Sequence, residues 1–376
     1  MTSDDRPRVA ILGTRGGPAR HGGSETFAER LSEFLVGRGW DVTVYCQADD
    51  REGGFSEDVW NGVHRVHVGT RSSGAFGTLE FDLKATLHAA RRRGVKLVLG
   101  YNTAVFNLVL RVGARRVVMN MDGIEWRRAK WGRAARAWLK WNEWIGAATS
   151  HHLVADHPEI ERHLRTVRRS AAISMIPYGA DVVSGVDRSQ FGALGLDATP
   201  FFVVVARAEP ENSILEVVRA FSEAPMGARL VVLGNLDPSV NRYHRQVLDA
   251  ASSECVFPGA IYDPGVVNAL RHHAVAYVHG HTVGGTNPSL VEALGAGAAV
   301  VAHDNVYNRW VAGEGALYFS DEGTCRDAML RLLHSEPERT ARRAASVEQH
   351  REAFTWPVVL GAYEDLLAAE VSRDAR

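Results

Sequence analysis

Short apolar runs alternate along the chain with longer segments in which apolar positions recur at helical spacing. In the first half, each run predicts a buried strand, and the first is followed by an amphipathic helix over residues 24–37. Strands joined by crossover helices form parallel sheets covered on both faces. The strands predicted in this half cover residues 8–12, 41–46, 96–100 and 117–119.

The same rhythm starts again after a stretch rich in proline and glycine between Ile176 and Pro200. A helix is predicted over residues 214–222, and strands over residues 201–206, 229–234, 274–279 and 299–302. Two separate series that each begin with a strand predict two doubly wound α/β domains rather than one barrel. We expect domains over residues 1–182 and 183–355, followed by a final helix that begins at Trp356.

Composition agrees with a folded two-domain protein and narrows its partners. The 376 residues are 45% hydrophobic and 23% charged, and the formal net charge is −1, which predicts no bulk attraction for nucleic acid or membrane. The three cysteines lie far apart, which argues against a zinc site or a disulfide framework. No Asp or His cluster has the spacing of a magnesium site. No signal-peptide pattern or long apolar run is present, so we expect a cytoplasmic protein.

A glycine-rich loop over residues 13–26 follows the first predicted strand. Gly16, Gly22 and Gly23 would let the backbone approach a ligand closely, and Ser24 is a natural N-cap whose helix offers free N–H groups to an anion. The loop has neither the dinucleotide-binding spacing nor a Walker lysine. The alternative is a tight turn that needs glycine for its own geometry.

A second such loop spans residues 279–297. Pro288 suits a first helical turn, so the N–H groups near Ser289 and Leu290 should point at a ligand. Glu292 lies one turn further and can reach the same cavity, where a carboxylate suits sugar hydroxyls. The alternative makes Glu292 a surface residue or a cap partner.

Arg207 directly follows a predicted strand of the second domain. Open α/β sheets bind ligands at this end of their strands, where a guanidinium can neutralise a diphosphate and stabilise it as a leaving group. The alternative is a surface ion pair with Glu209 or Glu211.

Taken together, these segments resemble glycosyltransferase family four, which has the two-domain GT-B fold, and in particular a rhamnosyltransferase-like subgroup. The resemblance covers nearly the whole chain. The hinge IPYGAD at residues 176–181 also matches, as does the helix at Trp356, which in such enzymes crosses back onto the first domain. Four blocks in order carry the resemblance: GTRG with GGSET at residues 13–16 and 22–26, MDGIEWRRAKW at 121–131, ARAEPENS at 206–213, and GGTNPSLVE at 284–292.

The resemblance implies a role for each matching residue. Arg207 would bind the donor diphosphate, Glu292 the nucleotide ribose, and the backbone at Pro288, Ser289 and Leu290 a phosphate. The loop around Ile261 would read the base, and Gly16, Gly22 and Gly23 would complete the phosphate site. The polar residues nearest the sugar would be His281, Thr286 and Asn287.

Asp122 is the best candidate to orient the acceptor hydroxyl, with Glu125 second; the alternative makes Asp122 a turn residue before Gly123. Three positions depart from the family pattern. Asn212 stands for a lysine, Gly285 for the first glutamate of a pair, and Met121 for a histidine. The subgroup shares these departures, which indicates a variant site.

The implied activity is transfer of a sugar from a nucleotide-diphosphate donor with retention of configuration and without a metal or other cofactor. A dTDP-deoxysugar such as dTDP-L-rhamnose is favoured as donor, with UDP- and GDP-sugars open. The acceptor is a hydroxyl of a glycan, a lipid-linked compound or a small molecule. Two rival hypotheses are a nucleotide-sugar epimerase and a non-catalytic nucleotide-sugar-binding subunit.

A basic region rich in tryptophan spans residues 111–144, with nine Lys or Arg against three acidic residues. One interpretation is a peripheral membrane contact for a lipid-linked acceptor. Another is a helix that buries its tryptophans in the core, which the scatter of the basic residues favours. An anionic soluble acceptor would also explain the basic excess.

Overall fold

The computed structural model describes residues 6–16, 22–48, 53–113, 115–128, 130–196 and 199–374. The chain forms two compact units. The N-terminal unit comprises Met1–Pro177 and Pro357–Arg376, and the C-terminal unit comprises Tyr178–Trp356. The first boundary therefore lies a few residues before the predicted position.

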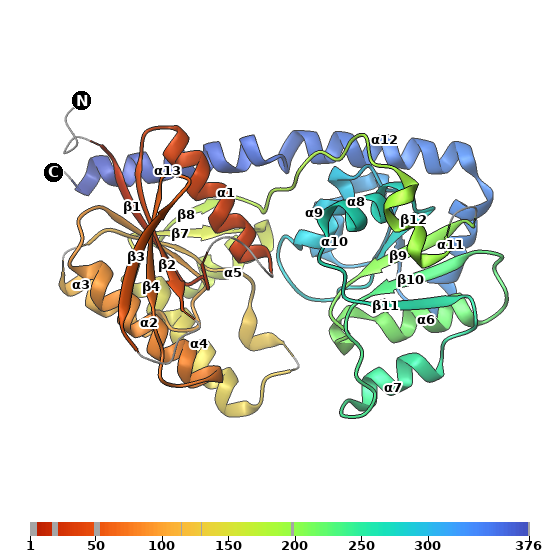
Figure 1. Cartoon of the computed structure of the whole chain (residues 1–376), viewed down its shortest axis with the longest axis horizontal. Helices are drawn as coiled ribbons and strands as arrows, with labels where there is room; N and C mark the ends of the chain where they lie inside the picture. The colour runs from red at the N-terminus through yellow and green to blue at the C-terminus, as the bar shows by residue number, and fades with distance from the viewer. Residues whose placement is uncertain are drawn as a thin grey trace. The chain divides into compact units, whose positions relative to one another are not determined.

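Within its described residues, the N-terminal unit has an eight-stranded sheet in the order β3-β4-β2-β1-β5-β6-β7-β8 (Figure 1). All neighbouring strands pair in parallel except β3 and β4. The strands are β1 Arg8–Leu12, β2 Asp41–Gln47, β3 Phe55–Trp60, β4 Val63–Val68, β5 Val95–Leu99, β6 Val117–Asn120, β7 His152–Ala155 and β8 Ala172–Met175.

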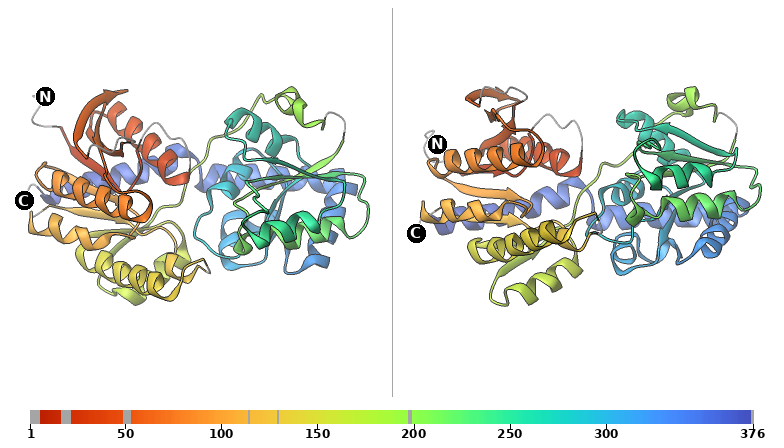
Figure 2. Two further views of the ribbon diagram at one scale, coloured as in Figure 1. Left: turned by 60° about the horizontal axis from the view of Figure 1, so that its bottom comes forward. Right: turned by 90° about the horizontal axis from the view of Figure 1, so that it is seen from below.

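Helices cover both faces of this sheet (Figures 1 and 2). Helices α2, α3 and α4 pack side by side on one face. On the other face α1 meets the last helix, where the rings of Phe27 and Tyr363 lie 4.7 Å apart. The helices are α1 Gly23–Gly37, α2 Gly74–Ala90, α3 Asn107–Val112, α4 Arg133–Thr149, α5 Pro158–Val167 and α13 Trp356–Asp374.

The C-terminal unit has a parallel six-stranded sheet, again within its described residues, in the order β11-β10-β9-β12-β13-β14. Its strands are β9 Phe201–Val205, β10 Arg229–Leu233, β11 Cys255–Gly259, β12 Ala276–His279, β13 Val300–His303 and β14 Leu317–Phe319. Its helices are α6 Ile214–Ser222, α7 Arg242–Asp249, α8 Pro264–His273, α9 Pro288–Gly295, α10 Val306–Ala312, α11 Glu322–His334 and α12 Glu336–Ala353. The predicted fold of two doubly wound parallel-sheet domains is confirmed.

The core of the C-terminal unit has two layers, one on each face of its sheet. Phe202, on one face of β9, packs with Phe221 of α6, while Phe201 packs on the opposite face with Phe191. Because both faces are covered, β9 reads as a continuous apolar run, FFVVV. This unbroken run of apolar residues is the reason that the strand could be predicted from the sequence.

The two points where the chain passes from one unit to the other lie close together. Ala180 pairs with Thr355 and donates its N–H to the Phe354 carbonyl at 2.8 Å. Gly179 lies against Trp356, whose ring would be 2.6 Å from a Cβ at that position. Glycine is therefore required in the IPYGAD segment by this close approach of an indole ring.

The tryptophans of α4 are exposed, contrary to the interpretation that they fill the core. Trp138, Trp141 and Trp144 are 40%, 48% and 59% exposed, whereas Leu139 and Ile145 of the same helix are buried. In the described part of the chain, every helix is too short or too polar to cross a membrane.

Candidate functional site

The loop after β9 presents Arg207 to solvent. Its guanidinium forms neither a salt bridge nor a hydrogen bond with the residues the structure describes, so the alternative of an ion pair with Glu209 or Glu211 is wrong. Asn212 is buried and donates its side-chain N–H to the Arg207 carbonyl at 2.8 Å. Ser213, also buried, has φ of 49°, a strained value for a residue other than glycine.

A second loop, which follows β12, is fastened to the Arg207 loop. Thr282 donates both its backbone N–H and its hydroxyl to the Glu211 carbonyl, at 2.9 and 3.0 Å. Gly280 approaches so closely that a Cβ there would lie 2.3 Å from the Asn212 carbonyl oxygen. These contacts bring the Arg207 block and the GGTNPSLVE block together at the carboxyl ends of β9 and β12.

The N-terminus of α9 is already capped by its own chain. The N–H of Ser289 donates to the Asn287 side chain, and the N–H of Leu290 to the Asn287 carbonyl, both at 3.1 Å. Pro288 has no N–H to offer. Phosphate binding by the backbone at these residues stays a prediction. Asn287, predicted to face the sugar, has its carbonyl oxygens occupied by this cap.

Two backbone N–H groups earlier in the same loop remain available. Those of Gly284 and Gly285 form no hydrogen bond with any described residue. Gly284 has φ of 146°, and a Cβ there would meet nothing within 4 Å, so the backbone conformation and not crowding requires glycine. Gly285 stands where the family has a glutamate, so this loop offers backbone N–H groups in place of an acidic side chain.

Glu292 is half-buried on α9 and is held by a residue that the sequence did not indicate. Arg271 of α8, only 4% exposed, donates from Nη2 to Glu292 Oε2 at 2.5 Å. The other carboxylate oxygen, Oε1, has no partner among the described residues. Glu292 is therefore a fixed carboxylate with one oxygen free, rather than a solvated surface residue.

His281, predicted near the sugar, stacks on His279 of β12. Their ring centroids lie 4.2 Å apart and the planes are within 8°. His279 is buried, and burial followed by the nearby His281 holds its pKa well below its ordinary value, so the ring is neutral. Thr286 of the same loop is buried.

The predicted base-reading loop follows β11. Ile261 packs partly buried against the core of the C-terminal unit, and the N–H of Ala260 donates to the Asn235 side chain at 3.1 Å. Asp263 ends the loop by capping α8. Base recognition at Ile261 stays a prediction.

Asp122 lies in the N-terminal unit, directly after β6, and is exposed. Its φ of 52° is strained, and its N–H donates to the Asn120 side chain at 2.8 Å. Asn120 in turn donates to the Tyr363 hydroxyl of α13 at 2.8 Å. The buried Tyr363 thus holds Asn120, and Asn120 holds the backbone of Asp122. A simple turn before Gly123 would not need these two hydrogen bonds.

Glu125 is buried, and its carboxylate is already occupied. Arg128 lies 2.8 Å from one oxygen, while Trp131 and Lys130 lie 3.3 and 3.7 Å from the other. The Glu125 N–H donates to the Tyr101 hydroxyl at 2.8 Å. These contacts favour a structural role for Glu125, which holds together the MDGIEWRRAKW block.

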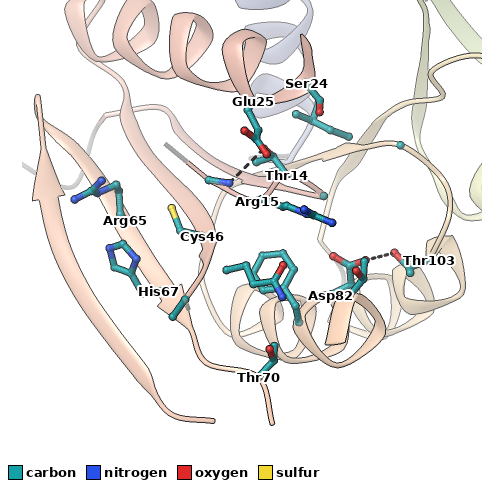
Figure 3. Close-up of a pocket in the computed structure, with 18 of the residues that line it drawn as sticks. Thr14, Arg15, Ser24, Glu25, Cys46, Arg65, His67, Thr70, Asp82 and Thr103 are labelled. Atoms are coloured by element: carbon teal, nitrogen blue, oxygen red, sulfur yellow. Dashed lines mark hydrogen bonds between the residues drawn. The ribbon is translucent and has the colours of Figure 1, made fainter. Parts of the chain in front are cut away.

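A cavity of about 1250 Å³ opens at the carboxyl ends of β1, β2 and β5 in the N-terminal unit (Figure 3). Gly16 forms part of its wall, with φ of 115°, and a Cβ there would lie 2.5 Å from the Cys46 sulfur. Gly16 is thus required by the turn itself. The prediction that Ser24 caps α1 is wrong, because Gly22 is the N-cap, with φ of 101°.

Most of the cavity wall is uncharged and rich in hydroxyl groups. The hydroxyl-bearing residues on it are Thr14, Ser24, Ser56, Thr70, Ser72, Ser73, Thr78 and Thr103. These hydroxyl groups offer hydrogen bonds that can be donated or accepted, beside the charged residues Arg15, Glu25, Asp58, Arg65 and Asp82 of the same wall. A polyhydroxylated compound is the chemistry that this wall fits best.

Of the charged residues that line the cavity, Asp82 was not singled out from the sequence, and Arg15 entered only as part of the GTRG block. Asp82 of α2 accepts a hydrogen bond from the Thr103 hydroxyl at 2.8 Å, and Arg15 points into the same cavity (Figure 3). Burial raises the pKa of Asp82 to about 6, and the Thr103 hydrogen bond opposes that rise. The sequence did indicate that Asp82 is unusual, because this carboxylate follows Phe81 on the apolar side of a helix.

Gly22 is the N-cap of α1 and Gly23 is its first residue. Both belong to the N-terminal unit, whereas Arg207, Gly284 and Glu292 belong to the C-terminal unit. That the two groups bind one donor together stays a prediction. Gly17, the remaining glycine of the loop, lies outside the described residues.

Residues 6–181 match the family model of a domain of unknown function, DUF1972. No curated protein matches the chain. Among solved structures, a sucrose-phosphate synthase from Thermosynechococcus elongatus is similar, with 18% identity, a TM-score of 0.81, and coverage of 97% of this chain and 100% of its own.

Two other similar structures have 13% identity. An α,α-trehalose-phosphate synthase (UDP-forming) from Burkholderia xenovorans, in complex with glucose-6-phosphate, has a TM-score of 0.75 and coverage of 96% and 100%. The HepE protein of Anabaena, in complex with UDP and glucose, has a TM-score of 0.78 and coverage of 97% and 100%. At these identities the likeness shows the fold, which is the GT-B fold predicted from the sequence.

Proposed function

We propose that the protein is a glycosyltransferase that moves a sugar from a nucleotide-diphosphate donor to a hydroxyl acceptor. The observation that carries the proposal is that two loops fastened to each other hold an Arg207 guanidinium and the N–H groups of Gly284 and Gly285, all without a partner among the described residues. A diphosphate needs such a combination of positive charge and backbone donors. The fold and the four sequence blocks support the same activity.

In this proposal the C-terminal unit binds the donor. Arg207 and the N–H groups of Gly284 and Gly285 would bind the diphosphate, and the free oxygen of Glu292 would accept from a ribose hydroxyl. The sugar would lie near His281 and Thr286. The capped start of α9 contributes its helix dipole rather than direct N–H bonds.

The acceptor would enter the cavity of the N-terminal unit. Asp82 is the group best placed to fix an acceptor hydroxyl by a charge-assisted hydrogen bond. Arg15 would bind an anionic substituent, which makes a sugar, with or without a phosphate, the acceptor class to test first. Asp122, outside the cavity wall but after the neighbouring strand β6, would orient the reacting hydroxyl.

The reaction would proceed with retention of configuration and without a metal. The bond between the anomeric carbon and the diphosphate breaks, and the diphosphate leaves with the electron pair that Arg207 stabilises. The acceptor oxygen then bonds to the same face of the anomeric carbon, and its proton passes to the departing phosphate. In this scheme the protein accelerates the reaction by aligning the two substrates and by placing fixed charges beside the leaving group.

The nucleotide is the most open part of the proposal. The rhamnosyltransferase-like blocks favour a deoxyhexose on dTDP. UDP stands in the names of two of the similar structures, so a UDP-sugar is the first competitor.

Nucleotide binding and transfer test the proposal separately. Thermal shift against UDP, dTDP, GDP and ADP should single out one nucleotide, and Arg207→Ala should abolish that shift and the transfer while the unliganded protein melts as before. Arg242→Ala removes another exposed arginine from the C-terminal unit, on α7, and should change neither. Unaltered transfer by Arg207→Ala would overturn the assigned donor site.

The rival activities give different results in the same assay. An epimerase would isomerise the nucleotide sugar when no acceptor is added. A non-catalytic subunit would bind the nucleotide with Arg207 and release no free nucleotide with any acceptor. Release of the nucleotide that depends on an added acceptor distinguishes the transferase from both.

A further inference from the structure

The exposed face of α4 carries three tryptophans that nothing in the proposed reaction uses. Trp138, Trp141 and Trp144 are spaced three residues apart, so they follow one another round the outer side of the helix. The helix is held to its unit by other residues, among them the buried Leu139, Asn142 and Ile145. These buried residues, rather than the three tryptophans, make up the side of α4 that faces its unit.

These tryptophans are only slightly engaged by the rest of the protein. Trp138 donates its indole N–H to the Asn102 carbonyl at 3.0 Å and contacts the Trp141 ring, with centroids 5.6 Å apart. The indole N–H groups of Trp141 and Trp144 have no partner among the described residues. Three large aromatic surfaces in water along a single helix indicate a binding surface.

Positive charge accompanies the tryptophans on the same helix. Arg133, Arg136 and Lys140 are exposed, and none of them forms a salt bridge in the part of the chain that the structure describes. The acidic residue of α4, Glu143, is buried and accepts a hydrogen bond from His163 at 2.8 Å. The exposed face is thus purely basic, although the whole chain has a net charge of −1.

We propose that this face, formed by Arg133, Arg136, Trp138, Lys140, Trp141 and Trp144, binds the surface of an anionic lipid bilayer. Tryptophan favours the headgroup level of a bilayer because its ring is apolar and its N–H can stay hydrated or bonded to lipid. Neighbouring cations are attracted by anionic headgroups. A helix with this division of side chains lies in the plane of the interface.

Charge complementarity selects the bilayer as the occupant. Protein interfaces are depleted of lysine at their centres, whereas here Lys140 lies between Trp138 and Trp141 in the sequence, and its ammonium lies 5.2 Å from the Trp126 ring. The surface concerns attachment and not chemistry. It therefore stands independently of the glycosyltransferase proposal.

Flotation of the full chain with vesicles tests the inference without any activity assay. The protein should float with vesicles of phosphatidylcholine and phosphatidylglycerol and not with phosphatidylcholine alone. Binding should weaken as salt is raised, and the tryptophan fluorescence should shift to the blue on binding. Absence of binding to anionic vesicles at low salt would overturn the proposal.

Matched variants locate the surface. The triple change Trp138→Ser, Trp141→Ser and Trp144→Ser, and separately Arg133→Glu, Arg136→Glu and Lys140→Glu, should each weaken binding by about tenfold or more. Phe76→Ser, at an aromatic residue of α2 that is 76% exposed, and Arg242→Glu on α7 are the controls and should bind as the parent does.

Two further measurements keep the result interpretable. Each variant changes exposed side chains, so its thermal midpoint should stay close to that of the parent; a variant that melts early is replaced by single substitutions. If size-exclusion chromatography instead shows a dimer that the triple tryptophan variant abolishes, a second copy covers this face and the lipid proposal is wrong.

Discussion

Arg271 of α8 forms a salt bridge with Glu292 of α9, in which Nη2 and Oε2 lie 2.5 Å apart. The arginine is buried while the carboxylate is partly exposed, and its Oε1 atom has no partner among the described residues. Such an arrangement positions a ligand-binding group before the ligand arrives. The salt bridge and the proposed ribose contact can therefore be separated by mutation.

Glu292→Gln should weaken nucleotide binding by about tenfold, because it removes the charged acceptor for a ribose hydroxyl. Arg271→Gln breaks the same salt bridge and leaves the carboxylate in place, so it should weaken binding less. Isothermal titration of both variants with the nucleotide found above makes the comparison. Equal losses would mean that Glu292 acts only as a partner of Arg271.

Asn212→Ala should loosen the loop that presents Arg207. The change removes the 2.8 Å hydrogen bond to the Arg207 carbonyl and should cost about 1 kcal/mol of unfolding free energy, with a several-fold rise in the KM for the donor. Asn241→Ala is the matched control, because it removes an N-cap on α7 at a similar cost in stability. An unchanged donor KM in Asn212→Ala would show that the loop keeps its position without this contact.

Asp82→Asn should change how stability depends on pH. The pKa of Asp82 in the folded protein is about 6 against an ordinary value of 3.8, so the folded state holds the proton more tightly than the unfolded chain. Parent stability should therefore fall as pH rises from about 4 to about 6. The variant, which cannot ionise, should gain up to about 3 kcal/mol over the parent above that range.

Denaturant titrations at pH 4 and pH 7.5 measure this difference, which should be near zero at the lower pH. The same carboxylate is proposed to bind the acceptor, so kcat/KM of the parent should rise through about pH 6 and Asp82→Asn should lose that rise. A variant with the parent's pH profile would remove Asp82 from the acceptor site.

Glu370→Gln should destabilise the N-terminal unit. The Glu370 carboxylate is fully buried on α13 and lies 2.5 Å from Arg116. Burial alone would raise its pKa, but the nearby His152, Arg116 and Arg373 lower it to about 2. Leaving the partly buried Arg116 unpaired should cost about 3 kcal/mol at pH 7.

Because its pKa is lowered on folding, Glu370 stabilises the protein above about pH 4.5, and this contribution disappears as pH falls toward 2. The gap between parent and Glu370→Gln should therefore shrink in acid. Glu364→Gln is the control, since Glu364 of the same helix pairs with an exposed Arg38 and should cost less than about 1 kcal/mol. A gap that is constant with pH would contradict the assignment.

Periodicity predicted most of the buried strands but missed the β3–β4 hairpin and the strands β7, β8, β11 and β14. β3 is exposed along nearly its whole length and so shows no apolar run. Its turn did carry a signal: Asn61 and Gly62 have φ of 47° and 81°, the conformation that an Asn-Gly hairpin turn requires. The glycine-rich loops that precede helices were predicted correctly because their glycines lie within a few consecutive residues of the sequence.

The parts of the site that the sequence did not indicate depend on contacts between distant segments. Arg271 meets Glu292 across two helices, and Asp82 meets Thr103 across a strand and a turn. The exposed tryptophans of α4 were misjudged because the same spacing serves a buried face and a surface that binds a partner. Only the packing of Leu139 and Ile145 decides which side of that helix points inward.

The helix α13 completes the first unit with a segment that is synthesised only after the whole second unit. Tyr363 and Glu370 bind Asn120 and Arg116, which leave the ribosome about 250 residues earlier. Residues up to Pro177 therefore leave the face around Phe27 uncovered until α13 has been synthesised, whereas the second unit, which ends at Trp356, is complete before the rest of α13. A chain truncated after Thr355 should accordingly carry a protease-resistant second unit and a first unit that is still open to cleavage or to a chaperone.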